Sequence, residues 1–277
     1  MKRKIFLLAV SIIMTALPLL PASSGEPAAG RSSVHIRGAG TVMSLIQYSA
    51  EEYMSENPNV IISVSGGGTD RGIKSLIDGT SQIAMASSEI NEELLLFAEE
   101  KGVTLVKHAV AYDAIVPVVN PDNPVSSLSK EQLRKIYTSG ITNWKEVSGK
   151  DLPIDLTTRN LGSGTYEGWK HLVIGKEAVM SPRAIPMESR PLRKYISENP
   201  DAIGYFAFSY IDNSIKPLAV NGILASYESI KSGKYPLKRE LILYTREDAS
   251  AEIINFIEYV KEATPKFAEA AGVFPIN

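Results

Sequence analysis

In the first part of the chain, segments whose apolar positions repeat with the period of a strand alternate with segments whose apolar positions repeat with the period of a helix. Residues 34–37 alternate like a strand, and residues 42–57 have apolar side chains at helical spacing until Asn57-Pro58 ends the run. The alternation continues with strand-like runs at 60–64, 82–85 and 103–106 and helical runs at 71–77 and 92–101. Because strands that alternate with helices usually pair in parallel, this pattern predicts a parallel sheet with helices on both faces.

The rest of the chain begins with a long apolar run at 109–120, which predicts a strand long enough to cross from one lobe to another. The run at 203–208 predicts a hydrophobic strand that carries the chain back. Further strands are predicted at 154–158 and 241–244, and helices at 130–137, 166–174, 192–199 and 251–266. We therefore expect a first lobe of residues 31–110 plus 212–277 and a second lobe of residues 111–211.

The first thirty residues have the layout of a secretory signal peptide. Residues 2–4 are basic, residues 5–20 are apolar, and small residues follow. We expect cleavage at about residues 22–30 and export of the mature chain. The alternative is an N-terminal membrane anchor, but the apolar run is shorter than the roughly 20 residues of a span and contains Pro18.

Composition narrows the class of protein. The chain has no cysteine, which excludes a lipid anchor, a disulfide, a thiolate metal site and a cysteine nucleophile. Its net charge is −2, and losing Lys2, Arg3 and Lys4 with the signal peptide takes it to −5. A mildly acidic chain is a poor candidate for binding nucleic acid. We therefore expect a soluble protein of the periplasm.

One four-residue pattern, Gly-x-Gly-Thr, occurs three times, starting at Gly38, Gly66 and Gly162. Composition alone predicts about 0.06 such matches. Each copy lies where a strand-like run gives way to a helical run. A glycine-rich turn before a helix aims free backbone N–H groups at one point, with the positive end of the helix dipole behind them, and so makes an anion site. The third copy follows the strand at 109–120 that is predicted to cross between the lobes. An anion held by all three turns therefore lies in a cleft between the lobes.

Side chains in and beside these turns suit a tetrahedral oxyanion. Arg159, three residues before Gly162, can give a bidentate bond. Hydroxyl donors come from Thr41, Thr69, Ser163 and Thr165. The alternative for each motif is a tight turn with threonine as helix N-cap, and for Arg159 it is a solvated surface charge.

Motifs for catalysis, metals and cofactors are weak. Residues 67–72 have the glycine spacing of a P-loop, but Ile73 stands where the lysine must be. Residues 127–130 match Ser-x-x-Lys without the companion motifs of acyl-serine enzymes. The histidines, at positions 35, 108 and 171, lack metal-ligand spacing. We therefore predict no catalytic residues, no metal and no cofactor, in a protein that is not an enzyme.

Three longer segments carry a family resemblance: 133–147, 199–205 and 232–237. With the glycine motifs, they make the chain from about Val34 to its C-terminus resemble the phosphate-binding proteins of phosphate ABC importers. The resemblance implies an α/β fold of the two-lobed periplasmic-binding-protein type (type II), with the ligand cleft between the lobes. It also implies a monomer that captures inorganic phosphate and delivers it to a membrane permease and its ATPase.

The resemblance also implies a ligand set. Thr41 matches the family's threonine that contacts phosphate, and the backbone N–H of Val42 matches the contact beside it. Thr69 stands where the family usually has serine. The family's anion-holding arginine and its Ser-Gly-Thr trio match Arg159, Ser163, Gly164 and Thr165.

Position 87 departs from the family pattern. The best-known members have there an aspartate that accepts the proton of hydrogen phosphate and repels sulfate, whereas this chain has Ser87 followed by Ser88, where many shorter relatives have arginine. Our hypothesis is that Asp70 supplies the missing acceptor and pairs with Arg71. Alternatives stay open: another oxyanion such as sulfate or molybdate in the same fold, service to a sensor instead of uptake, or a phosphoryl-transfer enzyme.

Overall fold

The computed structural model describes residues 31–175 and 178–276. The predicted signal peptide and its cleavage site lie outside the described residues. From Arg31 onwards the chain forms one compact unit. No helix in the described ranges has the length and apolar character needed to cross a membrane.

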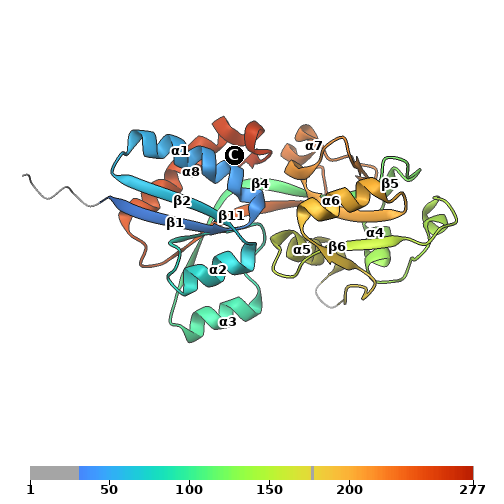
Figure 1. The fold of residues 1–277 in the computed structure, drawn as a ribbon, viewed down its shortest axis with the longest axis horizontal. Coiled ribbons are helices and arrows are strands. Elements are labelled where there is room, and N and C mark those ends of the chain that lie inside the picture. The colour runs from blue at the N-terminus through green and yellow to red at the C-terminus, as the bar shows by residue number, and fades with distance from the viewer. Residues whose placement is uncertain (1–30, 176–177, 277) are drawn as a thin grey trace, which may run out of the picture. The chain divides into compact units, whose positions relative to one another are not determined.

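The first lobe follows the predicted alternation of strands and helices (Figure 1). Its elements are β1 (Ser32–Gly38), α1 (Gly40–Glu56), β2 (Val60–Gly66), α2 (Thr69–Ile77), β3 (Ile83–Ala86) and α3 (Glu92–Glu100). β1 lies between β2 and β3 and pairs with both in parallel, as predicted. The long C-terminal helix α8 (Ala251–Ala271) packs beside α1.

Two long antiparallel strands, β4 (Leu105–Val119) and β11 (Lys238–Arg246), join the lobes. They lie in the middle of one sheet with the order β2-β1-β3-β11-β4-β8-β6-β7, so the sheet is mixed and not purely parallel. The predicted strands 103–106 and 109–120 are parts of the single strand β4. The polar residues that interrupt the apolar pattern have partners there: Lys107 pairs with Glu240, and His108 contacts Thr245 on β11.

The second lobe surrounds the other half of β4. Its elements are β5 (Ser127–Leu128), α4 (Lys130–Tyr137), η1 (Trp144–Val147), β6 (Asp155–Arg159), α5 (Gly164–Trp169), η2 (Lys170–Ile174), β7 (Ile185–Met187), α6 (Ser189–Glu198), β8 (Ala202–Ala207), η3 (Phe208–Tyr210), β9 (Lys216–Pro217), β10 (Ala219–Val220) and α7 (Tyr227–Lys231). The short strand β12 (Phe274–Pro275) returns to pair with β4. The predicted helix 166–174 divides into α5 and η2.

The strand expected to return the chain, β8, stays in the second lobe, where it pairs with β4 and β6. β11 makes the return instead. Between β8 and β11, Leu218, Val220, Ile230, Tyr235 and Leu237 are buried in the same apolar cluster as Trp144 and Trp169. Side-chain packing therefore places the stretch before β11 with the second lobe, whereas the sequence-based boundaries put residues 212–277 in the first.

Candidate functional site

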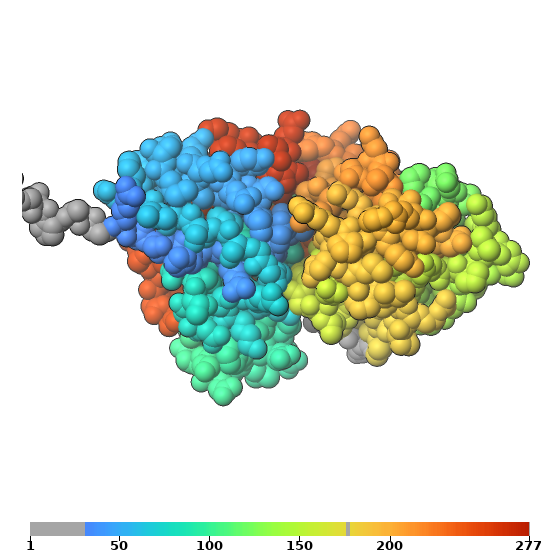
Figure 2. All heavy atoms as spheres, viewed as in Figure 1, coloured from blue at the N-terminus to red at the C-terminus, as the bar shows by residue number. Residues whose placement is uncertain are grey.

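A cavity of about 460 Å³ lies where the three glycine-rich turns meet. The first lobe lines it with 39–41, 67–68, Arg71 and Ser87, and the second lobe with 159–165, Glu188, Ser189 and Tyr210. Figure 2 shows the seam along which first-lobe atoms (blue to cyan) meet second-lobe atoms (yellow to orange). The structure thus brings the third turn, which lies more than 90 residues further along the chain, to the same cavity as the first two.

The first turn is set by Gly38, whose φ of 148° favours glycine. A Cβ at this position would lie 2.0 Å from the carbonyl oxygen of Met85, so the turn requires glycine for space as well. Helix α1 then begins at Gly40, with Thr41 in its first turn. The Thr41 Oγ1 is buried and has no hydrogen-bond partner among the described atoms. A buried hydroxyl without a partner is costly unless a ligand supplies one.

Two predicted ligand residues lie outside the cavity lining. Val42 is fully buried in the first-lobe core, and its N–H lies 3.2 Å from the carbonyl oxygen of Ala39. The Thr69 Oγ1 accepts a hydrogen bond from the N–H of Ser87 at 3.2 Å and so holds the turn that carries Ser87. Thr41, Ser87, Arg159, Ser163, Gly164 and Thr165 do line the cavity.

The lobes touch at the turns. A Cβ on Gly164 would lie 2.3 Å from both the Ser87 Oγ and the Thr69 Oγ1, and a Cβ on Gly68 would lie 2.7 Å from the carbonyl oxygen of Gly162. Real Cβ atoms are not found at such distances, so glycine at 164 and 68 is what allows the close approach. The structure therefore shows a closed arrangement of the two lobes.

Arg159 is buried at the end of β6 with 8% of its surface exposed, which rules out the surface-charge interpretation. Its Nε donates to the carbonyl oxygen of Met187 at 3.2 Å, and its Nη2 lies 3.4 Å from a carboxylate oxygen of Glu188. Burial lowers the pKa of Arg159 and Glu188 opposes that shift, but a guanidinium stays protonated in proteins. The cavity wall therefore carries a fixed positive charge next to the third turn.

The proposed acceptor Asp70 is not among the described residues that line the cavity. Its Oδ2 would lie 3.5 Å from a Cβ on Gly162, and no ion pair with Arg71 occurs within the described ranges. Burial raises the pKa of Asp70, and the charge of Glu93 adds to that effect. The hypothesis that Asp70 faces the ligand and pairs with Arg71 is therefore not supported by the geometry.

Comparison with known proteins places this site in a family. The family described as "PBP superfamily domain" matches residues 23–263. The phosphate-binding protein PstS of Bacillus subtilis (strain 168) is 35% identical over 246 residues, covering 87% of this chain and 78% of the relative. The chain belongs to the PstS family. Protein SphX of Synechococcus elongatus is 30% identical, covering 91% of this chain and 80% of the relative.

Solved structures of PstS-like proteins share the two-lobed fold. A putative phosphate ABC transporter substrate-binding protein from Clostridium perfringens, with bound phosphate, has a TM-score of 0.79 and 29% identity, and covers 89% of this chain and 100% of its own. An ABC-type phosphate transport receptor from Vibrio cholerae has a TM-score of 0.73 and 29% identity, covering 88% and 100%. The predicted periplasmic-binding-protein fold is confirmed.

In this PstS-family chain, sequence reasoning missed Glu188, Ser189 and Tyr210 of the cavity wall. They come from the start of α6 and from η3, which lack the glycine pattern that marked the other loops. Glu188 and Ser189, at the start of α6, belong to no sequence motif. They are recognised as site residues only because the fold brings this segment beside Arg159.

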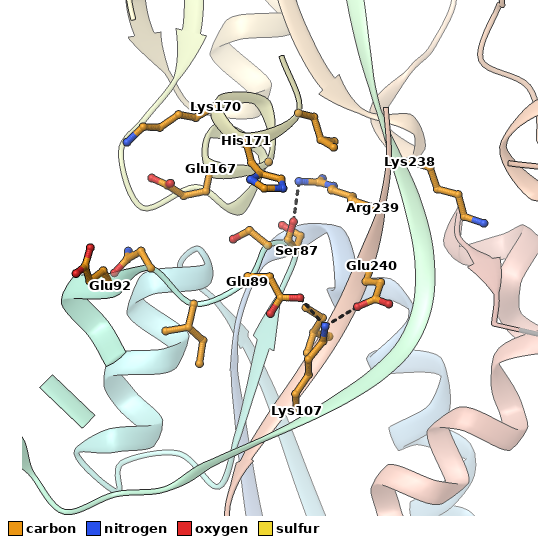
Figure 3. A pocket seen from close by; sticks show the side chains of 16 residues that line it. Ser87, Glu89, Glu92, Lys107, Glu167, Lys170, His171, Lys238, Arg239 and Glu240 are labelled. Carbon is orange, nitrogen blue, oxygen red and sulfur yellow. Dashed lines mark hydrogen bonds and ion pairs between the residues drawn. The ribbon is translucent and has the colours of Figure 1, made fainter. Parts of the chain in front are cut away.

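A second cavity of about 840 Å³ shares Ser87 with the first and is shown in Figure 3. Lys107 there lies between the carboxylates of Glu89 (2.5 Å) and Glu240 (2.7 Å). Acidic and basic side chains are mixed around this cavity, and none of the three glycine-rich turns contributes to the described residues that line it. It therefore lacks the converging donors of an anion site.

Proposed function

We propose that this protein captures inorganic phosphate in the 460 Å³ cavity and delivers it to an ABC importer. The observation that carries the proposal is the convergence of three glycine-rich turns and buried Arg159 on one cavity. Relatives named phosphate-binding protein and a related structure with bound phosphate support the choice of anion.

Each group has a distinct part in holding phosphate. Arg159 neutralises charge and offers a forked donor, and the N-termini of α1 and α5 supply backbone N–H groups. The unpaired hydroxyl of Thr41 donates to an oxygen of the anion, as do Ser87, Ser163 and Thr165. Thr69 supports Ser87, because its Oγ1 accepts a hydrogen bond from the Ser87 N–H. Dipoles in a water-poor cavity hold the anion strongly because competing water is excluded.

The proposal includes no chemical step. We propose an exported, monomeric protein of the periplasm that needs a permease and an ATPase as partners and no cofactor. The described residues that line the candidate site include hydroxyls, arginines and the carboxylate of Glu188 but no histidine, and we assign no nucleophile–base pair among them.

Competition titration of the purified mature protein tests the function. We expect phosphate to bind with a Kd of about 1 μM or tighter, as suits a scavenging protein, and arsenate to compete with it. Sulfate and molybdate are expected to bind far more weakly. Tighter binding of either would reassign the ligand, and turnover of a chromogenic phosphate ester would replace the transport role with an enzymatic one.

Glu188 is the candidate for distinguishing phosphate from sulfate. It is the only carboxylate among the described residues that line the cavity, and it contacts both Arg159 and the side-chain amide of Asn160. Hydrogen phosphate carries a proton that a carboxylate can accept, whereas sulfate at neutral pH has none. We propose that Glu188 makes this distinction in place of Asp70.

Glu188→Gln is expected to lower the phosphate-to-sulfate affinity ratio by about tenfold, the typical effect of losing one hydrogen bond to a charged group. The ratio is measured by isothermal titration of both anions at the same pH. Asp70→Asn is the matched control, because it also removes one carboxylate near the turns, and we expect it to leave the ratio unchanged. The reverse pattern would return the acceptor role to Asp70.

A further inference from the structure

Arg239 lies on β11, directly beneath the turns of the phosphate cavity, and its side chain is 6% exposed. All five of its N–H donors have acceptors. Nε donates to the Asp113 Oδ2 at 3.2 Å, and Nη2 donates to the same oxygen at 2.8 Å. Nη1 donates to the carbonyl oxygens of Ser87 and Gly164, each at 2.9 Å. Nη2 also donates to the Thr165 Oγ1 at 3.1 Å. A buried guanidinium with every donor used is held in one orientation.

These bonds join the two lobes. Ser87 follows β3 of the first lobe, while Gly164 and Thr165 begin α5 of the second. Asp113 lies on β4, the other joining strand, and its Oδ1 accepts from the N–H of Phe208 at 3.2 Å. Figure 3 shows Arg239 reaching from β11 to the turn at Ser87. One side chain therefore connects both joining strands to a cavity turn in each lobe.

The bond to Thr165 also fixes the direction of a hydroxyl. A threonine hydroxyl has a single proton, and the Thr165 Oγ1 is already the acceptor of the bond from Arg239. Its own O–H is therefore free to donate into the cavity that Thr165 lines. Arg239 itself is not among the described residues lining that cavity, so it acts on the anion through other residues.

We propose that Arg239, held by Asp113, is a positioning residue that stabilises the closed arrangement of the lobes and orients the hydroxyl of Thr165 toward the anion. The proposal rests on the proposed function for the identity of that anion. It assigns to a buried ion pair outside the binding cavity an influence on how long phosphate stays bound, exerted through Thr165 and the contacts between the lobes.

A double-mutant cycle tests the positioning role. The double variant Arg239→Met, Asp113→Leu removes both charges together, which avoids leaving one charge buried alone. We expect it to raise the Kd for phosphate at least tenfold, mainly through faster dissociation in stopped-flow measurements. Thr165→Val is expected to cost much less in this background than in the wild type, because the orienting bond is already gone. Equal costs in the two backgrounds, or an unchanged dissociation rate, would overturn the proposal.

Small-angle scattering without ligand gives a second readout. The double variant is expected to have a larger radius of gyration than the wild type, because the bonds that hold the lobes together are lost. If the wild type fails to bind phosphate, the proposed function fails while this comparison still decides the positioning role. Arg239→Lys, which keeps the charge but loses the fork, serves as a milder variant should the double variant not fold, and we expect an intermediate shift in both readouts. Unchanged scattering in a folded variant contradicts the proposal.

Discussion

Replacing Arg159 with alanine is expected to weaken phosphate binding by between about tenfold and a hundredfold while leaving the fold intact. The loss corresponds to about 1.5–3 kcal/mol for hydrogen bonds to a charged group. Arg159 supplies the buried positive charge of the cavity. Its neighbour Glu188 is 68% exposed, so in the variant the carboxylate that loses its partner is solvated and does not destabilise the fold. Isothermal titration measures the affinity, and far-UV circular dichroism checks the fold.

Arg134→Ala is the matched control for this variant. Arg134 also lies in the second lobe and also donates its Nε to a backbone carbonyl, that of Ile174, but it is half exposed and does not line the cavity. We expect its phosphate affinity to equal that of the wild type. If Arg159→Ala bound phosphate as tightly as Arg134→Ala, the anion would have to lie elsewhere.

The second large effect is expected from a single methyl group. Gly164→Ala places a Cβ 2.3 Å from the Ser87 Oγ and the Thr69 Oγ1, both in the opposite lobe. Gly164 is the first residue of α5 and is not at a positive φ, so alanine there suits the local backbone. The substitution therefore opposes the close approach of the lobes without straining the backbone at position 164. We expect phosphate affinity to fall at least tenfold, with thermal stability unchanged or slightly raised.

Gly140→Ala separates this effect from the general consequence of adding a methyl group. A Cβ at position 140 would meet its nearest neighbours at 3.5 Å, an ordinary contact within the second lobe. Titration and scattering of both variants, with and without phosphate, should show a loss of affinity and of compaction for Gly164→Ala alone. Wild-type affinity in Gly164→Ala would mean that the lobes bind phosphate without the closed contact.

Sequence reasoning succeeded where the signal is local. Helix α4 was predicted at 130–137 and occurs at Lys130–Tyr137, because Ser129 and Gln132 form a capping box that fixes its start. The glycine turns were found because glycine is needed there for both φ and space, as Gly38 shows. Their arrangement around one cavity followed from the rule that ligands bind at the carboxyl ends of strands.

Features that depend on distant pairing could not be predicted. Arg239 and Asp113 are 126 positions apart, and each lies in a strand whose local pattern gives no reason to expect an ion pair. Asp70 was preferred as acceptor for its nearness in sequence to the second turn, yet it is not among the described residues that line the cavity. The carboxylate that does line the cavity is Glu188, which the fold brings from another segment to Arg159.

The two strands that join the lobes, β4 and β11, pair over the whole of β11 and over residues 105–114 of β4, and their register shifts between Leu241 and Ile242. The lobes are therefore joined by paired strands in the middle of one sheet and not by two loose linkers. A register shift of this kind locally bends and twists the strand that carries it. Under the proposed function, any separation of the lobes has to deform these paired strands, which limits the directions in which the two walls of the cavity can move apart.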